Sequence, residues 1–237
     1  MPTKRGVLIT FEGGDGAGKS THMQFVAEAL RSRGEDVVCL REPGGTIIGE
    51  QLRAVVLDPG NYVMCDEAEL LIYEAARAQL VSQVIKPALE RGSIVLCDRF
   101  TDSTIAYQVY GRGLDFDFVQ RASSFACKDV VPDRTILMMT GGDAMLGIDR
   151  ATQHTHADRL EMAGADFHER VNAAYLDLAE QHPERIRMVV SNDTKASTAR
   201  KVFNELADLF EWFGDVTVCN DAFFDELVLR RETMGLA

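Results

Sequence analysis

Residues 11–21, with the sequence FEGGDGAGKST, contain a glycine-rich motif that is suited to bind phosphate. Gly13 is followed after four residues by Gly18, Lys19 and Ser20, which is the spacing of a P-loop. Glycines let consecutive backbone N–H groups converge on phosphate oxygens, the lysine reaches the β- and γ-phosphates, and the serine hydroxyl ligates Mg²⁺. A glycine-rich turn without chemistry is the competing interpretation, and the register of the lysine and serine disfavours it. We therefore expect a loop that binds a nucleoside triphosphate.

Such a loop has to lie between a strand and a helix, and the flanking sequence predicts both. Residues 7–11 are apolar, as in a buried strand, and residues 21–33 carry apolar side chains at helical spacing. Strand-like and helix-like segments continue to alternate, with crossovers too long for hairpins. The pattern predicts an α/β fold, a parallel sheet covered by helices on both faces. Further strands are expected at 35–40, 93–97, 136–139 and 187–190, and further helices at 49–57, 66–90, 116–126, 143–151, 165–181 and 196–213.

Charged side chains follow two of these strands, at the sheet edge where ligands of open α/β folds bind. Asp98 and Arg99 come directly after the third strand; the acid suits a Mg²⁺ shell opposite a P-loop and the arginine suits a phosphate. A structural ion pair is the alternative. Arg41 follows the second strand and opens a loop that proline and paired glycines bend. Tyr73 and Arg77 share one helix face, where spacing alone favours ordinary core packing over a joint role in binding.

Composition limits the class of protein. A chain of 237 residues with 46% hydrophobic content can form one large α/β domain or two small ones, and nothing in the sequence divides it. The net charge of −12 disfavours a nucleic-acid polymer as partner, so an anionic substrate has to meet local basic groups in a pocket. No stretch is long and apolar enough to span a membrane, and the N-terminus lacks the apolar region of a signal peptide. We expect a cytoplasmic protein.

The cysteines and the tail leave fewer clues. Five cysteines, an odd number without a CxxC pair, indicate neither a zinc site nor a disulfide framework. Residues 214–237 hold an apolar VTV run and a FFDELVLRR segment. A strand and a helix added to the edge of the fold, or part of a subunit contact, both fit this tail.

Six motifs occur in the order and approximate spacing of thymidylate kinases. They are FEGGDGAGKST, REPGGT from Arg41, AARAQL from Ala75, DRF from Asp98, STIAYQ from Ser103 and DRLE from Asp158. The chain thus resembles this family of P-loop nucleoside monophosphate kinases over about residues 6–210. The resemblance implies a P-loop NTPase fold with a five-stranded sheet, Mg²⁺-dependent phosphoryl transfer from ATP to dTMP, and a homodimer. Residues 1–213 would form the kinase domain, with a mobile lid at about 143–165, and residues 214–237 a C-terminal extension.

The resemblance also implies roles on the donor side. Lys19 and Ser20 would hold the ATP phosphates and Mg²⁺, with Asp98 in the outer shell of the metal. Arg99 would bridge the donor and acceptor phosphates, and Arg150 matches the lid arginine that packs on adenine. The full set of expected ATP contacts is Gly13, Gly14, Asp15, Gly16, Ala17, Gly18, Lys19, Ser20, Thr21 and Arg150.

On the acceptor side, Asp15 would hydrogen-bond the sugar 3′-hydroxyl, and Tyr107 would lie under the deoxyribose C2′, leaving little room for a ribose hydroxyl. Tyr73 stands where the family stacks an aromatic ring on thymine, and Arg77 matches the arginine that bonds the base O4. This implication replaces core packing as the interpretation of that pair. The remaining expected acceptor contacts are Arg41 or Arg53 for the monophosphate, together with Pro43, Ser103 and Gln108.

Phosphoryl transfer also profits from a mobile cation over the transferred group, and here the chain departs from the family. Some members place a catalytic arginine directly after the P-loop aspartate, where this chain has Gly16. Others place it in the lid before the DRxE motif, where Thr152 and His154 stand. The cation candidates are Arg150, Arg159 and, when protonated, His154 and His156. Neutral histidine is a poor substitute for arginine, so slow catalysis is a further outcome.

The sequence therefore predicts a dTMP kinase. Within the same class, the alternative is a kinase for another deoxynucleoside monophosphate, such as a 5-substituted dUMP, because the lid and tail are unusual. From a different class, the alternative is a nucleotide-binding regulator that has lost catalysis. The presence of Lys19, Asp98 and Arg99 disfavours the regulator.

Overall fold

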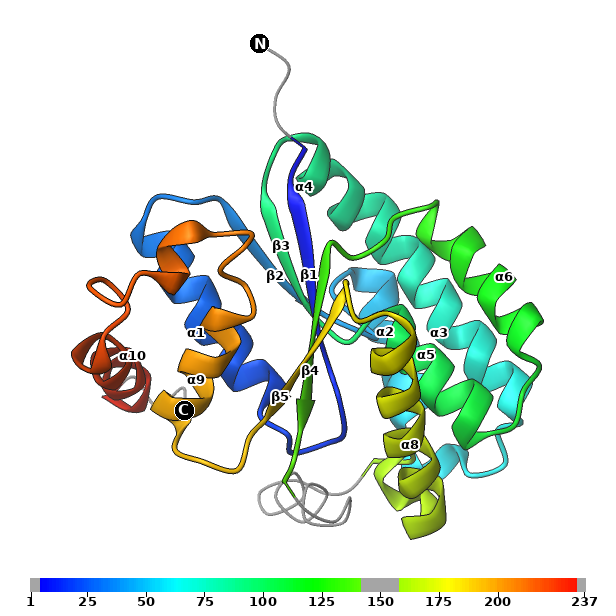
Figure 1. The fold of residues 1–237 in the computed structure, drawn as a ribbon. Coiled ribbons are helices and arrows are strands. Elements are labelled where there is room, and N and C mark those ends of the chain that lie inside the picture. The colour runs from blue at the N-terminus through cyan, green and yellow to red at the C-terminus, as the bar shows by residue number, and fades with distance from the viewer. Residues whose placement is uncertain (1–4, 142–157, 234–237) are drawn as a thin grey trace.

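The protein is built on a five-stranded parallel sheet (Figure 1). It was analysed as a computed structural model, which describes residues 5–141 and 158–233. The strands are β1 Val7–Glu12, β2 Val37–Arg41, β3 Ile94–Asp98, β4 Arg134–Met139 and β5 Ile186–Val190, in the spatial order β2-β3-β1-β4-β5. All neighbouring strands run parallel, so their carboxyl ends meet at one edge. The five predicted strands and the α/β class are confirmed.

Helices cover both faces of the sheet, because successive strand residues point to opposite faces. On one face, α1 Lys19–Ser32, α9 Lys195–Asn204 and α10 Asp221–Thr233 enclose the side of the core that contains Ile9 and Phe11 (Figure 1). Leu8 and Val95 belong to the core on the other face. The helices that cover this second face are α2 Ile47–Leu57, α3 Asp66–Leu80, α4 Lys86–Glu90, α5 Thr101–Thr104, α6 Phe116–Cys127 and α8 Ala165–Gln181. Across 5–141 and 158–233, no helix has the length and apolar character needed to cross a bilayer.

Two π-helical segments interrupt the helices that flank the pocket. The predicted helix at 66–90 is confirmed as one continuous run, in which Val81–Ile85 forms a π-helical turn between α3 and α4. The second segment, Ile105–Gly111, continues α5. In the sequence this stretch, IAYQVYG, mixes apolar residues with two tyrosines and a glutamine and has no clear helical periodicity. Its wider turn buries Tyr107 and Gln108 and brings them to the same pocket as the residues of α5.

The last predicted helix, 196–213, is wrong in its second half, because α9 ends at Asn204. Arg134 of β4 donates to the backbone oxygen of Glu205 at 2.6 Å. In a continuing α-helix that oxygen would accept the N–H of Leu209. The N–H of Leu209 instead closes a tight turn onto the backbone oxygen of Leu206 at 3.0 Å. A side chain from a distant strand thus replaces the helical hydrogen bond.

The tail after residue 213 contains one of the two elements considered for it. The VTV run is not a strand, because the N–H of Thr217 bonds the Asp215 carboxylate at 2.9 Å in an Asx turn. The FFDELVLRR segment lies within α10, which packs against α9 and α1. Phe224 and Leu227 of this helix are buried in the same core cluster as Phe203 of α9. The tail helix therefore completes the core on that face of the sheet.

Candidate active site

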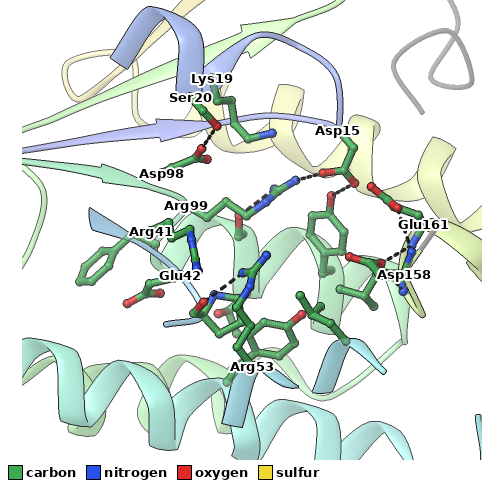
Figure 2. Close-up of a pocket in the computed structure, with 18 of the residues that line it drawn as sticks. Asp15, Lys19, Ser20, Arg41, Glu42, Arg53, Asp98, Arg99, Asp158 and Glu161 are labelled. Carbon is green, nitrogen blue, oxygen red and sulfur yellow. Dashed lines mark hydrogen bonds and ion pairs between the residues drawn. The ribbon is translucent and has the colours of Figure 1, made fainter. Parts of the chain in front are cut away.

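A pocket of about 470 Å³ opens beside the P-loop, at the carboxyl edge of the sheet (Figure 2). One end is lined by the P-loop and the start of α1, and the other by α3, α5 and the segment Ile105–Gly111. Of the residues predicted for the site, it brings together Asp15, Gly16, Gly18, Lys19, Ser20, Thr21, Arg41, Pro43, Arg53, Tyr73, Arg77, Asp98, Arg99, Ser103, Tyr107 and Gln108. Gly13, Gly14 and Ala17 belong to the loop but do not line the pocket. Arg150, Thr152, His154 and His156 lie outside the described residues, as does the predicted helix 143–151.

The P-loop has the backbone that its glycines predict. Gly13, Gly16 and Gly18 adopt positive φ angles of 126°, 69° and 90°. At Gly13 a Cβ atom would lie 2.0 Å from the backbone oxygen of Met138, so no other residue fits there. The ammonium group of Lys19 is buried and donates to the backbone oxygens of Gly13 and Gly14, at 3.1 and 2.7 Å. Burial and the nearby Arg99 lower the pKa of Lys19, and an anion in the loop would offset both effects.

Ser20 and Asp98 place two oxygen donors together at the entrance of the loop (Figure 2). Ser20 lies in the first turn of α1 and Asp98 at the end of β3. Because β1 and β3 pair in register, with Phe11 beside Asp98, the P-loop leaves β1 next to this carboxylate. The Ser20 hydroxyl donates a hydrogen bond to it. Hard oxygen donors of this kind suit Mg²⁺, which is usually held by one or two protein groups together with substrate phosphates and water.

Asp15 and Arg99 form the ion pair at the centre of the pocket (Figure 2). Arg99 has a φ of 69° and reaches Asp15 at 2.6 Å and the backbone oxygen of Gly13 at 3.0 Å. Its guanidinium lies 5.0 Å from the ring centroid of Tyr107, whose hydroxyl donates to Asp15 at 3.4 Å. Burial alone would raise the pKa of Asp15, but the charges of Arg99 and Lys19 outweigh it and hold that pKa at about 2. Both members of the pair are therefore charged at neutral pH.

Glu12 supports this pair from beneath and was not predicted to have a role. It is fully buried and accepts hydrogen bonds from the N–H of Phe100 at 2.7 Å, the Ser103 hydroxyl at 2.5 Å and the Tyr175 hydroxyl at 3.1 Å. Both hydroxyls also contact Arg99, at 3.2 Å. Burial raises the pKa of Glu12 to about 7. The only hint of this role in the sequence is that Glu12 is an acid at the end of an apolar strand.

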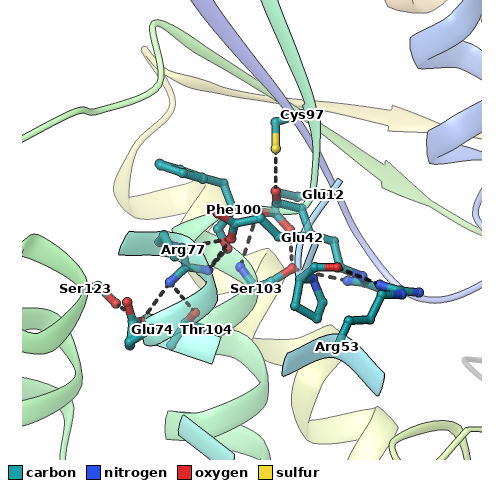
Figure 3. A network of polar contacts seen from close by, with 12 residues as sticks. Glu12, Glu42, Arg53, Glu74, Arg77, Cys97, Phe100, Ser103, Thr104 and Ser123 are labelled. Carbon is teal, nitrogen blue, oxygen red and sulfur yellow. Dashed lines mark hydrogen bonds and ion pairs between the residues drawn. The ribbon is translucent and has the colours of Figure 1, made fainter. Parts of the chain in front are cut away.

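Arg77 lies at the end of the pocket that α3 and α5 line, within a buried network (Figure 3). Its guanidinium donates to Glu42 at 2.8 Å, to Glu74 at 2.7 Å, to the Thr104 hydroxyl at 2.8 Å and to the backbone oxygen of Phe100 at 3.1 Å. A second nitrogen lies 2.7 Å from Glu42, so each of the three guanidinium nitrogens has a partner in this network. Burial raises the pKa of Glu42 to about 7, although Arg77 opposes that effect. Thr104 lines the pocket too and was not predicted.

Two further arginines reach the pocket, one from the last position of β2 and one from α2. Arg41 pairs with Glu50 at 3.1 Å, and Arg53 donates to the backbone oxygen of Pro43 at 3.0 Å. Thr46 caps α2 by accepting the N–H of Gly49, and this fixes the start of the helix that carries Arg53. Both guanidinium groups lie on the same side of the pocket as Glu42 (Figure 2).

In the DRLE segment, the two acids line the pocket and Arg159 does not. Asp158 and Glu161 line the pocket, whereas Arg159 donates to Glu69 at 2.5 Å and to the backbone oxygen of Val56 at 2.9 Å. The Asp158 carboxylate accepts the N–H of Glu161 at 2.9 Å, and Glu161 accepts the N–H of Asp158 at 2.9 Å. Arg159 is thus committed to anchoring this segment on α2 and α3. The two acids were not predicted to line the site.

Comparison with known proteins identifies the family. The thymidylate kinase family model matches residues 11–202. A thymidylate kinase from Geobacter sulfurreducens is 44% identical over 207 residues, covering 85% of this chain and 96% of the relative. One from an Exiguobacterium species is 46% identical over 181 residues, covering 76% and 84%. The crystal structure of thymidylate kinase from Ehrlichia chaffeensis superimposes with a TM-score of 0.68 at 30% identity, covering 85% of this chain and 99% of that one. The chain therefore belongs to the thymidylate kinase family.

Proposed function

We propose that this thymidylate kinase transfers the γ-phosphoryl group of ATP directly to dTMP, by in-line displacement and without a covalent enzyme intermediate. The ion pair of Asp15 and Arg99 carries the proposal, because it lies between a P-loop suited to the donor and an aromatic, amide-lined end suited to a base. The acceptor is already a phosphate dianion, so a general base has little to do. The protein then acts by positioning the two substrates and neutralising their charge.

On the donor side, Lys19 exchanges its two backbone acceptors for the β- and γ-phosphates, since these carbonyls lie within the same loop. Ser20 and Asp98 are the residues that would hold Mg²⁺. When bound there, the ion supplies charge neutralisation at the β- and γ-phosphates. Arg99 is charged and points into the centre of the pocket, where it would face both phosphates. Arg159 is paired with Glu69 and does not line the pocket. Among the residues that the structure describes, 5–141 and 158–233, Arg99 is therefore our candidate for stabilising the transferred phosphoryl group.

On the acceptor side, Asp15 and Tyr107 bind the deoxyribose, and Tyr73 stacks on the base. Burial raises the pKa of both tyrosines, so their hydroxyls stay protonated. Arg41 and Arg53 meet the monophosphate from the side of α2. Arg77 can reach a base carbonyl only by exchanging a present partner, and the neutral Thr104 hydroxyl is the least costly one to replace.

We also infer a homodimer. Exposed apolar side chains occur on α3 and α6, which pack beside each other on the outer side of the fold (Figure 1). Leu71 is 55% exposed, Phe118 49% and Phe125 87%. Covering them with a second copy would remove this apolar surface from water. Light scattering should give a dimer that Phe125→Glu converts to a monomer; a wild-type monomer at micromolar concentration would contradict the inference.

Initial rates with dTMP, dUMP, dGMP and 5-hydroxymethyl-dUMP, at saturating ATP and Mg²⁺, test the acceptor. We expect the highest kcat/KM for dTMP. A higher value for another acceptor would overturn that assignment while leaving the phosphoryl-transfer site in place. ATP binding without turnover of any acceptor would instead indicate a regulator.

A further inference from the structure

A buried hydrogen bond joins Glu69 to Gln108 behind the base end of the pocket. Glu69 lies on α3 and is fully buried; Gln108 is 2% exposed and lines the pocket. Nε2 of Gln108 donates to Oε1 of Glu69 at 2.9 Å. A pocket-lining amide is therefore held by an acid that does not line the pocket itself.

The surroundings of Glu69 decide which way this amide points. Its carboxylate also accepts Nε of Arg112 at 3.1 Å, Nη2 of Arg112 at 2.8 Å and Nη2 of Arg159 at 2.5 Å. Burial alone would raise the pKa of Glu69, but hydrogen bonds from Arg112 and Gln108 outweigh burial and lower it. An ionised carboxylate has no proton to donate, so only the NH₂ group of Gln108 can face it. The amide nitrogen and oxygen are thus distinguished by the chemistry of the neighbour.

We propose that Glu69 is a positioning residue for base selection, which holds the Gln108 amide with its oxygen, Oε1, turned to the base. This inference rests on the proposed dTMP acceptor. An oxygen at that place pairs with a base that carries an N–H, as thymine and uracil do at N3. Cytosine has a lone pair at N3, so two acceptors would face each other at a side chain that is only 2% exposed. A site built around one hydrogen bond rejects a ligand that leaves its buried polar groups unpaired.

Glu69→Gln tests this role because the new side chain has the same shape and one donor. Two arginine nitrogens meet Oε2 of Glu69 and one meets Oε1, so the amide oxygen of the variant should stay at the Oε2 position. Its NH₂ group then faces Gln108, which turns its own oxygen away from the pocket and its NH₂ group toward the base. We expect kcat/KM to fall about tenfold for dTMP, mainly through KM, and to rise for dCMP. The kcat/KM for dUMP should fall together with that for dTMP, because both bases carry an N3–H.

Two controls separate positioning from general damage. Asp66→Asn removes an outer partner of Arg112 at 3.4 Å but leaves every contact of Glu69 in place, so it should not change the ratio of dTMP to dCMP turnover. In a Gln108→Leu background, adding Glu69→Gln should leave that ratio unchanged. An equal loss for dTMP and dCMP in Glu69→Gln, or the same shift in Asp66→Asn, would overturn the inference.

A binding measurement on the wild-type protein covers the case in which the variant does not fold. N3-methyl-dTMP carries a methyl group in place of the N3–H donor, so we expect its affinity to be at least about tenfold below that of dTMP. Equal affinity would show that no acceptor faces N3 and would refute the orientation assigned to Gln108. A wild-type protein that prefers another acceptor altogether would refute the proposed function instead.

Discussion

Replacing the buried Glu12 with glutamine should change how stability depends on pH. The carboxylate is fully enclosed beneath the P-loop. Burial and the charge of Asp102 raise its pKa from 4.5 to about 7, against the opposing effects of Ser103 and Arg99. Glutamine has the same shape, and its NH₂ group can meet the two hydroxyls at Oε2, but it carries no charge at any pH.

The linkage between proton binding and folding gives the direction and the size of the expected change in the free energy of unfolding. The carboxyl group loses its proton near pH 4.5 in the unfolded chain but near pH 7 in the folded protein. Between these values the folded state binds more protons, so the free energy of unfolding falls as pH rises. At about 1.4 kcal/mol per pKa unit, wild type loses about 3 kcal/mol across this window. The Glu12→Gln variant lacks that loss, so its stability relative to wild type should rise by about 3 kcal/mol between pH 4.5 and pH 8.

Urea unfolding of both proteins at a series of pH values measures the difference. Burial also raises the pKa of Glu42 to about 7, but Glu42 titrates in both proteins and cancels. Glu90→Gln, the same substitution at an exposed position at the end of α4, is the matched control. A flat or falling difference for Glu12→Gln would refute the reasoning, since it would mean that the hydrogen bonds from Ser103 and Tyr175 outweigh burial.

Four further substitutions test other parts of the structure. Lys19→Ala should lower kcat by at least about 10³-fold in a coupled assay, since it removes the cation from the β- and γ-phosphates; near-normal turnover would contradict its role. Tyr107→Ala should relax discrimination against the ribonucleotide of thymine, and an unchanged kcat/KM ratio would remove Tyr107 from the sugar site. Phe224→Ala, which empties a buried ring site against Phe203, should cost about 3–5 kcal/mol in urea unfolding, and an unchanged midpoint would show that α10 is dispensable. Thr46→Ala should cost about 1 kcal/mol through the lost cap of α2, measured the same way.

Features that depend on neighbours along the chain were predictable. The spacing from Gly13 to Ser20 indicated the loop, and apolar periodicity indicated the strands and most helices. Asp98 was expected near the loop because the carboxyl ends of parallel strands share one edge, and β1 and β3 are indeed neighbours. The shared helix face of Tyr73 and Arg77 was predicted in the same way, and both line the pocket.

Features set by distant partners were not predictable. Glu12 bonds Tyr175, which lies 163 residues away, and Glu69 bonds Arg159, 90 residues away. In sequence both acids look like ordinary polar residues at the end of a strand or within a helix. The end of α9 is another case, because the carbonyl of Glu205 is taken by Arg134, 71 residues earlier. None of these contacts has a local signal.

The sequence by itself determined the chemistry that this protein can attempt: a phosphate loop, a basic and aromatic acceptor set and the strand–helix alternation that brings them to one edge. Local spacing is sufficient there, because backbone geometry converts it directly into position. Only the tertiary structure decided which charged side chains point into the pocket and which are held by partners elsewhere. It committed Arg159 and Arg77 to buried acids, left Arg99 paired with Asp15 at the centre of the pocket, and placed Glu69 behind Gln108. The physical reason is that the partner of a buried charge is chosen by packing between segments far apart in the chain, where desolvation makes an unpaired group costly.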